Sequence, residues 1–144
     1  RRRYEDRELN QLVQIISVWL TVTMEAQGEP YAGKLAVASV IRNRAKEKGV
    51  AFSDVVFKAQ QFSCWLTGSP TLMGLDSVPE RVYGECLKAT LAAIWMLEPD
   101  PTNGAVFYLR YDINKPLWWS LDADQASEVR IGDHLFRRAK AQRV

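Results

Sequence analysis

Two glutamates stand where an apolar, helix-patterned segment meets a break in the chain. In TVTMEAQGEPY, residues 21–31, Glu25 borders the apolar side of the preceding segment and Glu29 stands directly before Pro30. A carboxyl group packed against apolar side chains keeps its proton more readily, because burial disfavours its charged form. Such a group is suited to act as a general acid that protonates a departing oxygen. Spacing alone also fits a Glu25 whose carboxylate reaches water, and Glu29 is expected to cap or brace the next helix.

The stretch QQFSCW, residues 60–65, places polar side chains beside aromatic ones. Gln61 and Ser63 offer hydrogen-bond donors and acceptors, while Phe62 and Trp65 offer flat apolar faces. This combination suits pyranose rings, which carry hydroxyl groups at their edges and C–H groups on their faces. The alternative is a loop that Phe62 and Trp65 hold down by packing into the core.

A second aromatic group, in GAVFYLRYDINKPLWWS, precedes the single histidine of the chain. Tyr108, Tyr111, Trp118 and Trp119 are typical of a binding groove or of a small core beneath a sheet. If the two tryptophans lie in an extended segment, one faces inward and the other outward. His134 alternates with apolar neighbours, which favours a hydrogen-bonded structural residue over a catalytic one.

Composition excludes several classes of site. One histidine and no Asp/Glu/His cluster with ligand spacing argue against a metal site, and nothing indicates a cofactor. A formal net charge of +2 is too small to indicate nucleic-acid binding. Cys64 and Cys86 cannot form a disulfide framework. Cys86 is expected to be a buried thiol, and a single bridge between the two remains open.

The candidate residues lie on, or between, three predicted helices. Apolar residues recur at helical spacing over about 7–27, and Gly28 is expected to end that helix as its C′ residue. A second helix, from Tyr31 to about 48, is rich in small apolar residues and is predicted to be the central, buried helix. A short helical turn at 53–59, with Ser53 as N-cap, precedes an irregular loop over 60–78. A third, largely buried helix is predicted over about 79–97.

The end of the chain shows a different pattern. Residues 104–111 and 127–137 are predicted to be short strands or extended segments, linked by NKPLWWS at 114–120. We therefore expect an α+β fold, mostly α, in one compact domain over 1–144, with flexible ends at 1–7 and 139–144. The longest apolar run, LAAIWML at 91–97, is too short to span a membrane. The opening RRRYEDRE has no apolar stretch of the signal-peptide type.

The order of five sequence blocks is more specific than any one of them. MEAQGEPYAGKLAVASVIRNR is followed by QQFSCW, DPTNGAVFY, PLWW and IGDHLFRR. Together they resemble the cell-wall hydrolase family of spore-cortex-lytic enzymes, over about residues 8–138. The resemblance implies a lysozyme-like domain, related to lytic transglycosylases, that cleaves the glycan strands of peptidoglycan at the bacterial cell wall without a cofactor. It implies that Glu25 is the catalytic residue, that Gln61, Phe62 and Ser63 lie beside the cleft, and that the IGxHxF residues are structural.

Two departures from the family pattern bear on the mechanism. Thr67 stands where relatives often have an aspartate, and Phe107 stands where some have a histidine. A second catalytic acid is therefore in doubt, although Asp76, Asp112 and Asp122 are candidates. A hydrolase needs two carboxylates across the scissile bond. A lytic transglycosylase works with one, so we favour that reaction over a muramidase.

Two readings from other classes stay open. The chain could be a non-catalytic peptidoglycan-binding module that uses the same aromatic loop. It could also be a component of a larger assembly such as a virion, with wall lysis of the endolysin type as a local task. Both agree with a monomer or with a domain of a larger protein.

Overall fold

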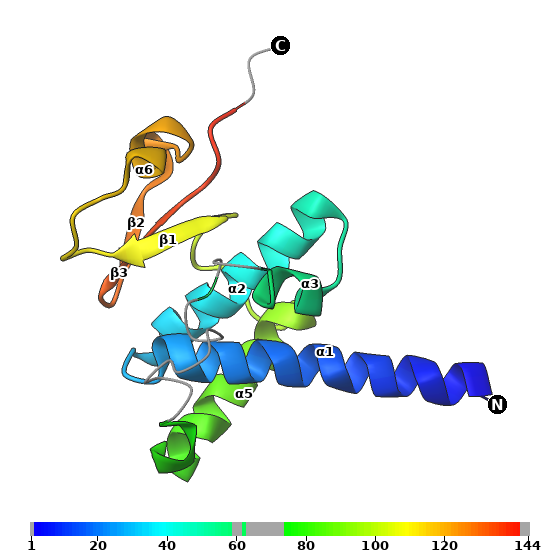
Figure 1. Ribbon diagram of the computed structural model, residues 1–144. Helices are drawn as coiled ribbons and strands as arrows, with labels where there is room; N and C mark the ends of the chain where they lie inside the picture. Colours follow the sequence, from blue (N-terminus) through cyan, green and yellow to red (C-terminus); the bar gives the residue numbers. More distant parts are fainter. Residues whose placement is uncertain (1, 59–61, 63–73, 142–144) are drawn as a thin grey trace.

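The computed structural model describes residues 2–58, 62 and 74–141, with the side chains of residues 2–4 left aside. Helices form the larger part, and a small sheet lies late in the chain, so the predicted mostly helical α+β class is correct (Figure 1). The elements, in chain order, are α1 (Arg2–Ala26), α2 (Tyr31–Lys48), α3 (Phe52–Val56), η2 (Leu75–Ser77), α5 (Glu80–Ile94), β1 (Phe107–Arg110), α6 (Leu117–Leu121), η3 (Gln125–Ser127), β2 (Val129–Ile131) and β3 (His134–Arg137).

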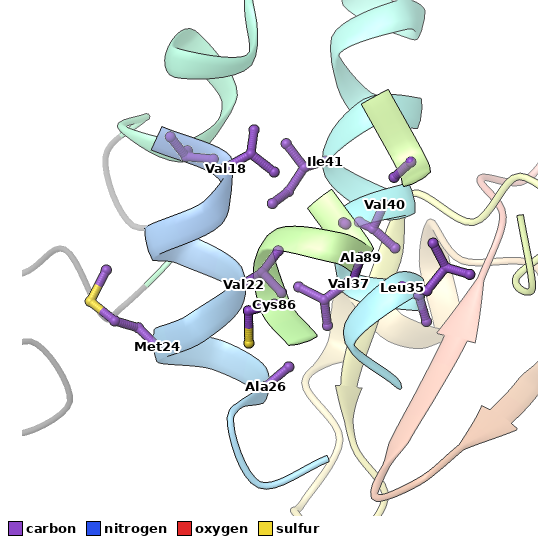
Figure 2. Packing of buried hydrophobic residues seen from close by; sticks show 14 of the residues in the cluster. Val18, Val22, Met24, Ala26, Leu35, Val37, Val40, Ile41, Cys86 and Ala89 are labelled. Carbon is purple, nitrogen blue, oxygen red and sulfur yellow. The ribbon is translucent and has the colours of Figure 1, made fainter. Parts of the chain in front are cut away.

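The core lies where α1, α2 and α5 pack together. As predicted, α2 is the central helix: residues 33–41 are all buried, so its apolar side chains face several neighbours at once. Figure 2 shows Val22 of α1, Val37 of α2 and Ala89 of α5 meeting in this core. Small residues along α2 let the neighbouring helices approach closely. Cys86 of α5 is fully buried here, while Cys64 lies outside the described residues.

The turn between α1 and α2 differs in detail from the prediction. The first helix ends at Ala26, and Gly28 does not adopt the left-handed conformation of a C′ glycine. Pro30 occupies the N-cap position of α2 with an extended backbone. The left-handed glycine is instead Gly49, with φ +64°, which ends α2 and leaves open space around the position of a Cβ atom.

The short helix α3 starts one residue earlier than the predicted cap. Ala51 is its N-cap residue, and the Asp54 carboxylate accepts a hydrogen bond from the Ala51 amide at 3.2 Å. Ser53 has another task, since its amide donates to the Gln14 side chain at 2.8 Å and its hydroxyl accepts from Gln14 at 3.0 Å. These bonds tie α3 to α1.

Helix α5 is shorter than predicted, and the segment that follows it is exposed. Met96 has a left-handed backbone, with φ +55°. The Leu97 amide closes the helix by donating to the Ala92 carbonyl at 2.9 Å. Trp95, Met96 and Leu97 are all more than half exposed, so burial up to residue 97 is wrong. No helix within the described ranges is both long and apolar enough to cross a membrane.

The loop between α5 and the sheet is clamped to α2 by Asp100. The Asp100 carboxylate accepts from the amide and the hydroxyl of Thr102 at 2.8 and 2.7 Å, and from the amide of Gly104 at 2.9 Å. Asn43 of α2 donates to the same carboxylate at 2.9 Å and to the Ala105 carbonyl at 2.9 Å. These bonds fix the start of β1 relative to the central helix.

The sheet has the antiparallel strand order β1-β3-β2. Tyr108 of β1 pairs with Phe136 of β3, and Ile131 of β2 pairs with His134. Residues 127–137 are thus a hairpin rather than one extended segment, because Gly132, with φ +58°, reverses the chain. Every residue of β3, the middle strand, is buried.

The link between β1 and β2 contains a helix, α6, that was not predicted from the sequence. Helix α6 begins directly after Pro116, a residue that suits the start of a helix. Trp119 is 1% exposed and packs with Leu109, Ala123 and Leu135 in a second, smaller core. Trp118 is 38% exposed. One tryptophan faces in and one faces out, as expected, but the helical turn between them is the cause.

Candidate functional site

A cleft of about 700 Å³ lies between the end of α1, the C-terminal part of α2, and the sheet with its flanking segments. This volume is within the range of sites that hold small molecules or parts of polymers. Residues between 24 and 29 and residues 133 and 134 both line the cleft, so the first and the last of the five sequence blocks lie beside each other. The cleft is lined by Met24, Glu25, Gly28, Glu29, Arg44, Phe107, Tyr108, Leu109, Arg110, Ile113, Trp118, Asp133 and His134.

Glu25 lies in the last turn of α1 and is half-buried, between the buried residues Met24 and Ala26. Its carboxylate lines the cleft and accepts a hydrogen bond on Oε2 from the Tyr108 hydroxyl at 3.3 Å. The α1 periodicity turns the neighbours of Glu25 into the core and leaves the carboxylate at the cleft. A group in this position can meet a ligand in the cleft while apolar side chains limit its access to water.

Glu29 lies in the same cleft, but its carboxylate is held by the β2–β3 hairpin. It is 8% exposed and accepts from the Asp133 amide with both oxygens, at 3.2 Å each. Its Oε1 lies 2.7 Å from Nδ1 of His134, which is itself buried from solvent. Glu29 therefore braces the hairpin, whereas the sequence suggested a cap or brace for α2.

An aromatic cluster supports the hydroxyl that contacts Glu25. The Tyr108 ring meets the His134 ring edge-on at 5.3 Å and stacks on the Phe136 ring at 5.6 Å. Phe62, expected to offer a face to a sugar, is 3% exposed and does not line the cleft. Its ring lies 6.5 Å from that of Tyr108, so within the described residues it serves the core.

Arg44 of α2 is a cleft residue that was not among the site residues predicted from the sequence. Its Nε donates to the Val106 carbonyl at 2.6 Å, and its guanidinium lies over the Phe62 ring at 5.2 Å. Burial lowers the pKa of Arg44, and the nearby Tyr108 and Glu25 partly offset that effect. Arg44 is the last residue of the first sequence block, and this position in the block was a signal that could have indicated a place in the cleft.

The far wall of the cleft is apolar. It is formed by Phe107, Ile113 and Trp118, and the Phe107 and Trp118 rings are 5.6 Å apart. Trp118 therefore lies where the sequence placed it, beside the cleft. Tyr111 does not line the cleft: it is 41% exposed, and the Arg130 guanidinium lies 3.9 Å from the centre of its ring.

The three aspartates considered as a second acid lie away from the cleft lining. Asp76 is in η2, and Asp122 follows α6. Asp112 is paired with Arg110 at 3.0 Å, and hydrogen bonds from that guanidinium lower the pKa of Asp112. Asp133 was missed, and its exposed side chain lines the cleft beside His134. It sits in the hairpin turn, which could not be located while 127–137 was read as one segment.

Three predicted contact residues, Gln61, Ser63 and Trp65, lie outside the described residues. In the part of the chain that is described, no three His, Cys, Asp or Glu side chains gather as a metal site would require.

The chain matches a family model and several known proteins. The family model is described as Cell Wall Hydrolase and matches residues 28–137. A spore cortex-lytic enzyme of Halalkalibacterium halodurans is 30% identical over 136 residues, which cover 92% of this chain and 35% of that protein. A spore cortex-lytic enzyme of Bacillus cereus is 32% identical over 117 residues, which cover 78% of this chain and 39% of that protein. The chain thus spans little more than a third of these relatives.

Two solved structures share the fold. The catalytic domain of the germination-specific lytic transglycosylase SleB from Bacillus anthracis superimposes with a TM-score of 0.65, at 28% identity over 87% of this chain and 93% of that one. The catalytic domain of the Bacillus cereus SleB protein gives a TM-score of 0.65, at 29% identity over 87% and 89% of the two chains. These matches confirm the expected lysozyme-like, mostly α fold class. Together with the family model, which covers most of the cleft lining, they show that this chain belongs to the cell wall hydrolase family.

Proposed function

We propose that this chain cleaves the glycan strands of peptidoglycan between N-acetylmuramic acid and N-acetylglucosamine, as a lytic transglycosylase whose catalytic residue is Glu25. The observation that carries the proposal is the position of Glu25. It is a half-buried carboxyl at the end of α1, inside a cleft of about 700 Å³, and it contacts the Tyr108 hydroxyl. Membership of the cell wall hydrolase family supports the substrate class, and the likeness to the SleB catalytic domain supports the reaction type.

The geometry favours Glu25 over Glu29 as the acid. Glu29 accepts hydrogen bonds from the Asp133 amide and lies against His134, so both of its oxygens are occupied by the protein. A general acid must instead direct an oxygen toward the substrate. Glu25 accepts on Oε2 from the Tyr108 hydroxyl, which can rotate, and this contact leaves its carboxyl able to face the cleft.

One carboxyl group suffices for the proposed reaction. Protonated Glu25 gives its proton to the glycosidic oxygen as the bond from that oxygen to C1 of the muramyl ring breaks. The resulting carboxylate then takes the proton of the C6 hydroxyl of the same ring. The C6 oxygen bonds to C1, and the products are a 1,6-anhydro-muramyl end and a free hydroxyl on the departing sugar. The proton returns to Glu25, and no water is consumed.

The aromatic wall is suited to the sugar rings. Trp118 and Phe107 offer apolar faces on the far side of the cleft, where C–H faces of pyranose rings can pack. Arg44 and Arg110 add hydrogen-bond donors along the lining. The protein is proposed to act at the bacterial cell wall, as a monomer or as a domain of a larger protein.

A muramidase is the second candidate, and Asp133 is the observation that favours it. This exposed carboxylate lines the same cleft as Glu25 and could direct a water molecule to the sugar, as hydrolysis by a two-carboxylate mechanism requires. The two reactions differ in their products. Hydrolysis leaves a reducing muramyl end, which is heavier by one water molecule than the anhydro end.

The test uses purified cell walls and mass spectrometry of the soluble products. Wild type is expected to release fragments with 1,6-anhydro-muramyl ends, and Glu25→Gln is expected to lower the rate by about 100-fold or more, because it cannot transfer the proton. Glu8→Gln is the matched control: the same change at an exposed position of α1 should leave the rate unchanged. Lysis at the wild-type rate by a folded Glu25→Gln protein would refute the assignment.

The other possible products discriminate between the alternatives. Reducing muramyl ends that disappear in Asp133→Asn would establish the hydrolase. Binding to insoluble walls without any release of fragments would establish a non-catalytic module.

A further inference from the structure

Glu29 connects two parts of the cleft that are far apart in sequence. It follows α1 by three residues, and the Asp133 amide that it binds lies 104 residues further along the chain. Because both Glu29 and His134 are more than nine-tenths buried, water cannot replace their contact without opening the structure. The contact therefore joins the α1–α2 turn directly to the β2–β3 hairpin.

Two glycines leave room for this carboxylate. A Cβ atom on Gly132 would lie 2.2 Å from Oε2 of Glu29, and a Cβ atom on Gly33 would lie 2.9 Å from Cβ of Glu29. Real Cβ atoms essentially never approach another atom to less than 3.0 Å. The backbones of α2 and of the hairpin turn thus approach Glu29 as closely as the chain allows, and the side chain has little freedom to move.

The contact continues through the aromatic cluster to Glu25. Nδ1 of His134 lies 2.7 Å from Oε1 of Glu29, and the His134 ring meets the Tyr108 ring edge-on at 5.3 Å. The Tyr108 hydroxyl donates to Glu25 Oε2 at 3.3 Å. A displacement of the hairpin would move His134, and with it the support of the ring whose hydroxyl contacts Glu25.

We propose that Glu29 is a positioning residue for Glu25: it fixes His134 against Tyr108, so that the Tyr108 hydroxyl holds the Glu25 carboxyl in the cleft. This inference rests on the proposed function of Glu25. It gives Glu29 a role in the turnover step, through two intervening side chains, in addition to its role in holding the hairpin.

A carboxylate is the group that this position requires. The Glu29 carboxylate accepts from the Asp133 amide on both oxygens, and its Oε1 lies 2.7 Å from Nδ1 of His134. A glutamine amide keeps one accepting oxygen but places a donating NH2 group where Oε2 accepts from the Asp133 amide, so two donors would face each other there. An aspartate is one methylene shorter and cannot reach both. Glu29→Gln therefore keeps the size of the side chain and disrupts one of its contacts.

The decisive experiment is a kinetic double-mutant cycle on a soluble glycan substrate, with wild type, Glu29→Gln, Tyr108→Phe and the double variant. Each single change is expected to lower kcat by about 10- to 100-fold, with KM within about 3-fold, because a small misplacement of a reacting group lowers the rate strongly. The double variant is expected to be no slower than the slower single variant, since both changes act on the same hydroxyl. Glu8→Gln again serves as the control that should change nothing.

A purely structural role for Glu29 gives a different result. In that case the two changes would multiply in kcat, or Glu29→Gln would lower only the melting temperature, and either outcome would overturn the proposal. Should Glu29→Gln fail to fold, His134→Asn tests the same step, because its side-chain amide retains a donor near the position of Nδ1 but removes the ring from Tyr108. The proposal requires a lower kcat for this variant, and an unchanged kcat would refute it.

The failure of this inference can be told apart from that of the proposed function. Wild-type activity in Glu25→Gln would refute the proposed function. An inactive Glu25→Gln together with a fully active Glu29→Gln would refute only the positioning role. The NMR signals of the Tyr108 ring protons provide a readout that needs no turnover. They are expected to shift in Glu29→Gln, and unmoved signals would contradict the inference.

Discussion

Gly132→Ala is expected to destabilise the protein far more than an ordinary glycine substitution in a turn. Two costs add at this position. A left-handed backbone costs a residue with a Cβ atom roughly 1–2 kcal/mol, and Gly132 has φ +58°. The new Cβ atom would also lie 2.2 Å from Oε2 of Glu29, so the carboxylate must move by about 1 Å or more to reach ordinary contact. Such a movement would break the 2.7 Å contact of Glu29 with His134 and the 3.2 Å hydrogen bond from the Asp133 amide. Leaving a buried polar group without its hydrogen bonds costs roughly 1–3 kcal/mol.

Gly49→Ala separates the two costs. Gly49 has almost the same backbone, with φ +64°, but nothing lies within 4 Å of its Cβ position. It should therefore show only the backbone cost, roughly 1–2 kcal/mol. Urea unfolding of both variants, followed by circular dichroism, measures the difference. We expect Gly132→Ala to lose about 1–3 kcal/mol more than Gly49→Ala. Equal losses would show that Glu29 does not lie against residue 132, and the brace would have to be abandoned.

Three further predictions concern other parts of the molecule. Burial of Asp100 would raise its pKa, but hydrogen bonds from Thr102 and other donors outweigh burial and lower the pKa. The contribution of Asp100 to stability is therefore present above the unfolded pKa of about 3.9 and is lost as the pH falls below that value. Asp100→Asn should cost about 1–2 kcal/mol in urea unfolding at pH 7, and less at pH 3. Met96→Gly should raise the free energy of unfolding by about 0.5–1 kcal/mol in the same assay, because glycine adopts the left-handed backbone of this helix end without strain. A lower free energy of unfolding would mean that losing the 3.0 Å contact of Met96 Sδ with Arg42 outweighs the relief of backbone strain. Trp118→Ala should raise KM for soluble glycan by about 5- to 10-fold with little change in kcat, because the change removes part of the apolar wall of the cleft. An unchanged KM would exclude Trp118 from substrate binding.

The helices could be predicted where one pattern dominates a long segment. The central helix α2 matches its predicted bounds because Pro30 and Gly49 flank a run of small apolar residues. Helix α6 could not be predicted, because five residues are too few to show a helical period and the pair Trp118–Trp119 also suits an extended segment. The turn of the hairpin could not be predicted either, because the pattern of apolar residues does not reveal it. The turn at Gly132 interrupts an apolar alternation that otherwise continues from β2 into β3.

The candidate site was predictable in part. Glu25 and Trp118 could be placed at a cleft because the first follows helical spacing and the second stands in an aromatic cluster. Arg44 and Asp133 could not be placed from periodicity, since their positions depend on how α2 and the hairpin approach each other. Phe62 shows the opposite error, because an aromatic residue in a polar loop can serve the core as readily as a ligand.

The strand order β1-β3-β2 has a consequence for biosynthesis. The middle strand is the last of the three to leave the ribosome, so neither neighbour has its partner until β3 has emerged. A nascent chain that has already exposed Glu25 still lacks Asp133 and His134, which form the opposite side of the cleft. The cleft is therefore complete only after β3 has been translated, and a fragment that stops short of β3 carries Glu25 without the hairpin side of the cleft.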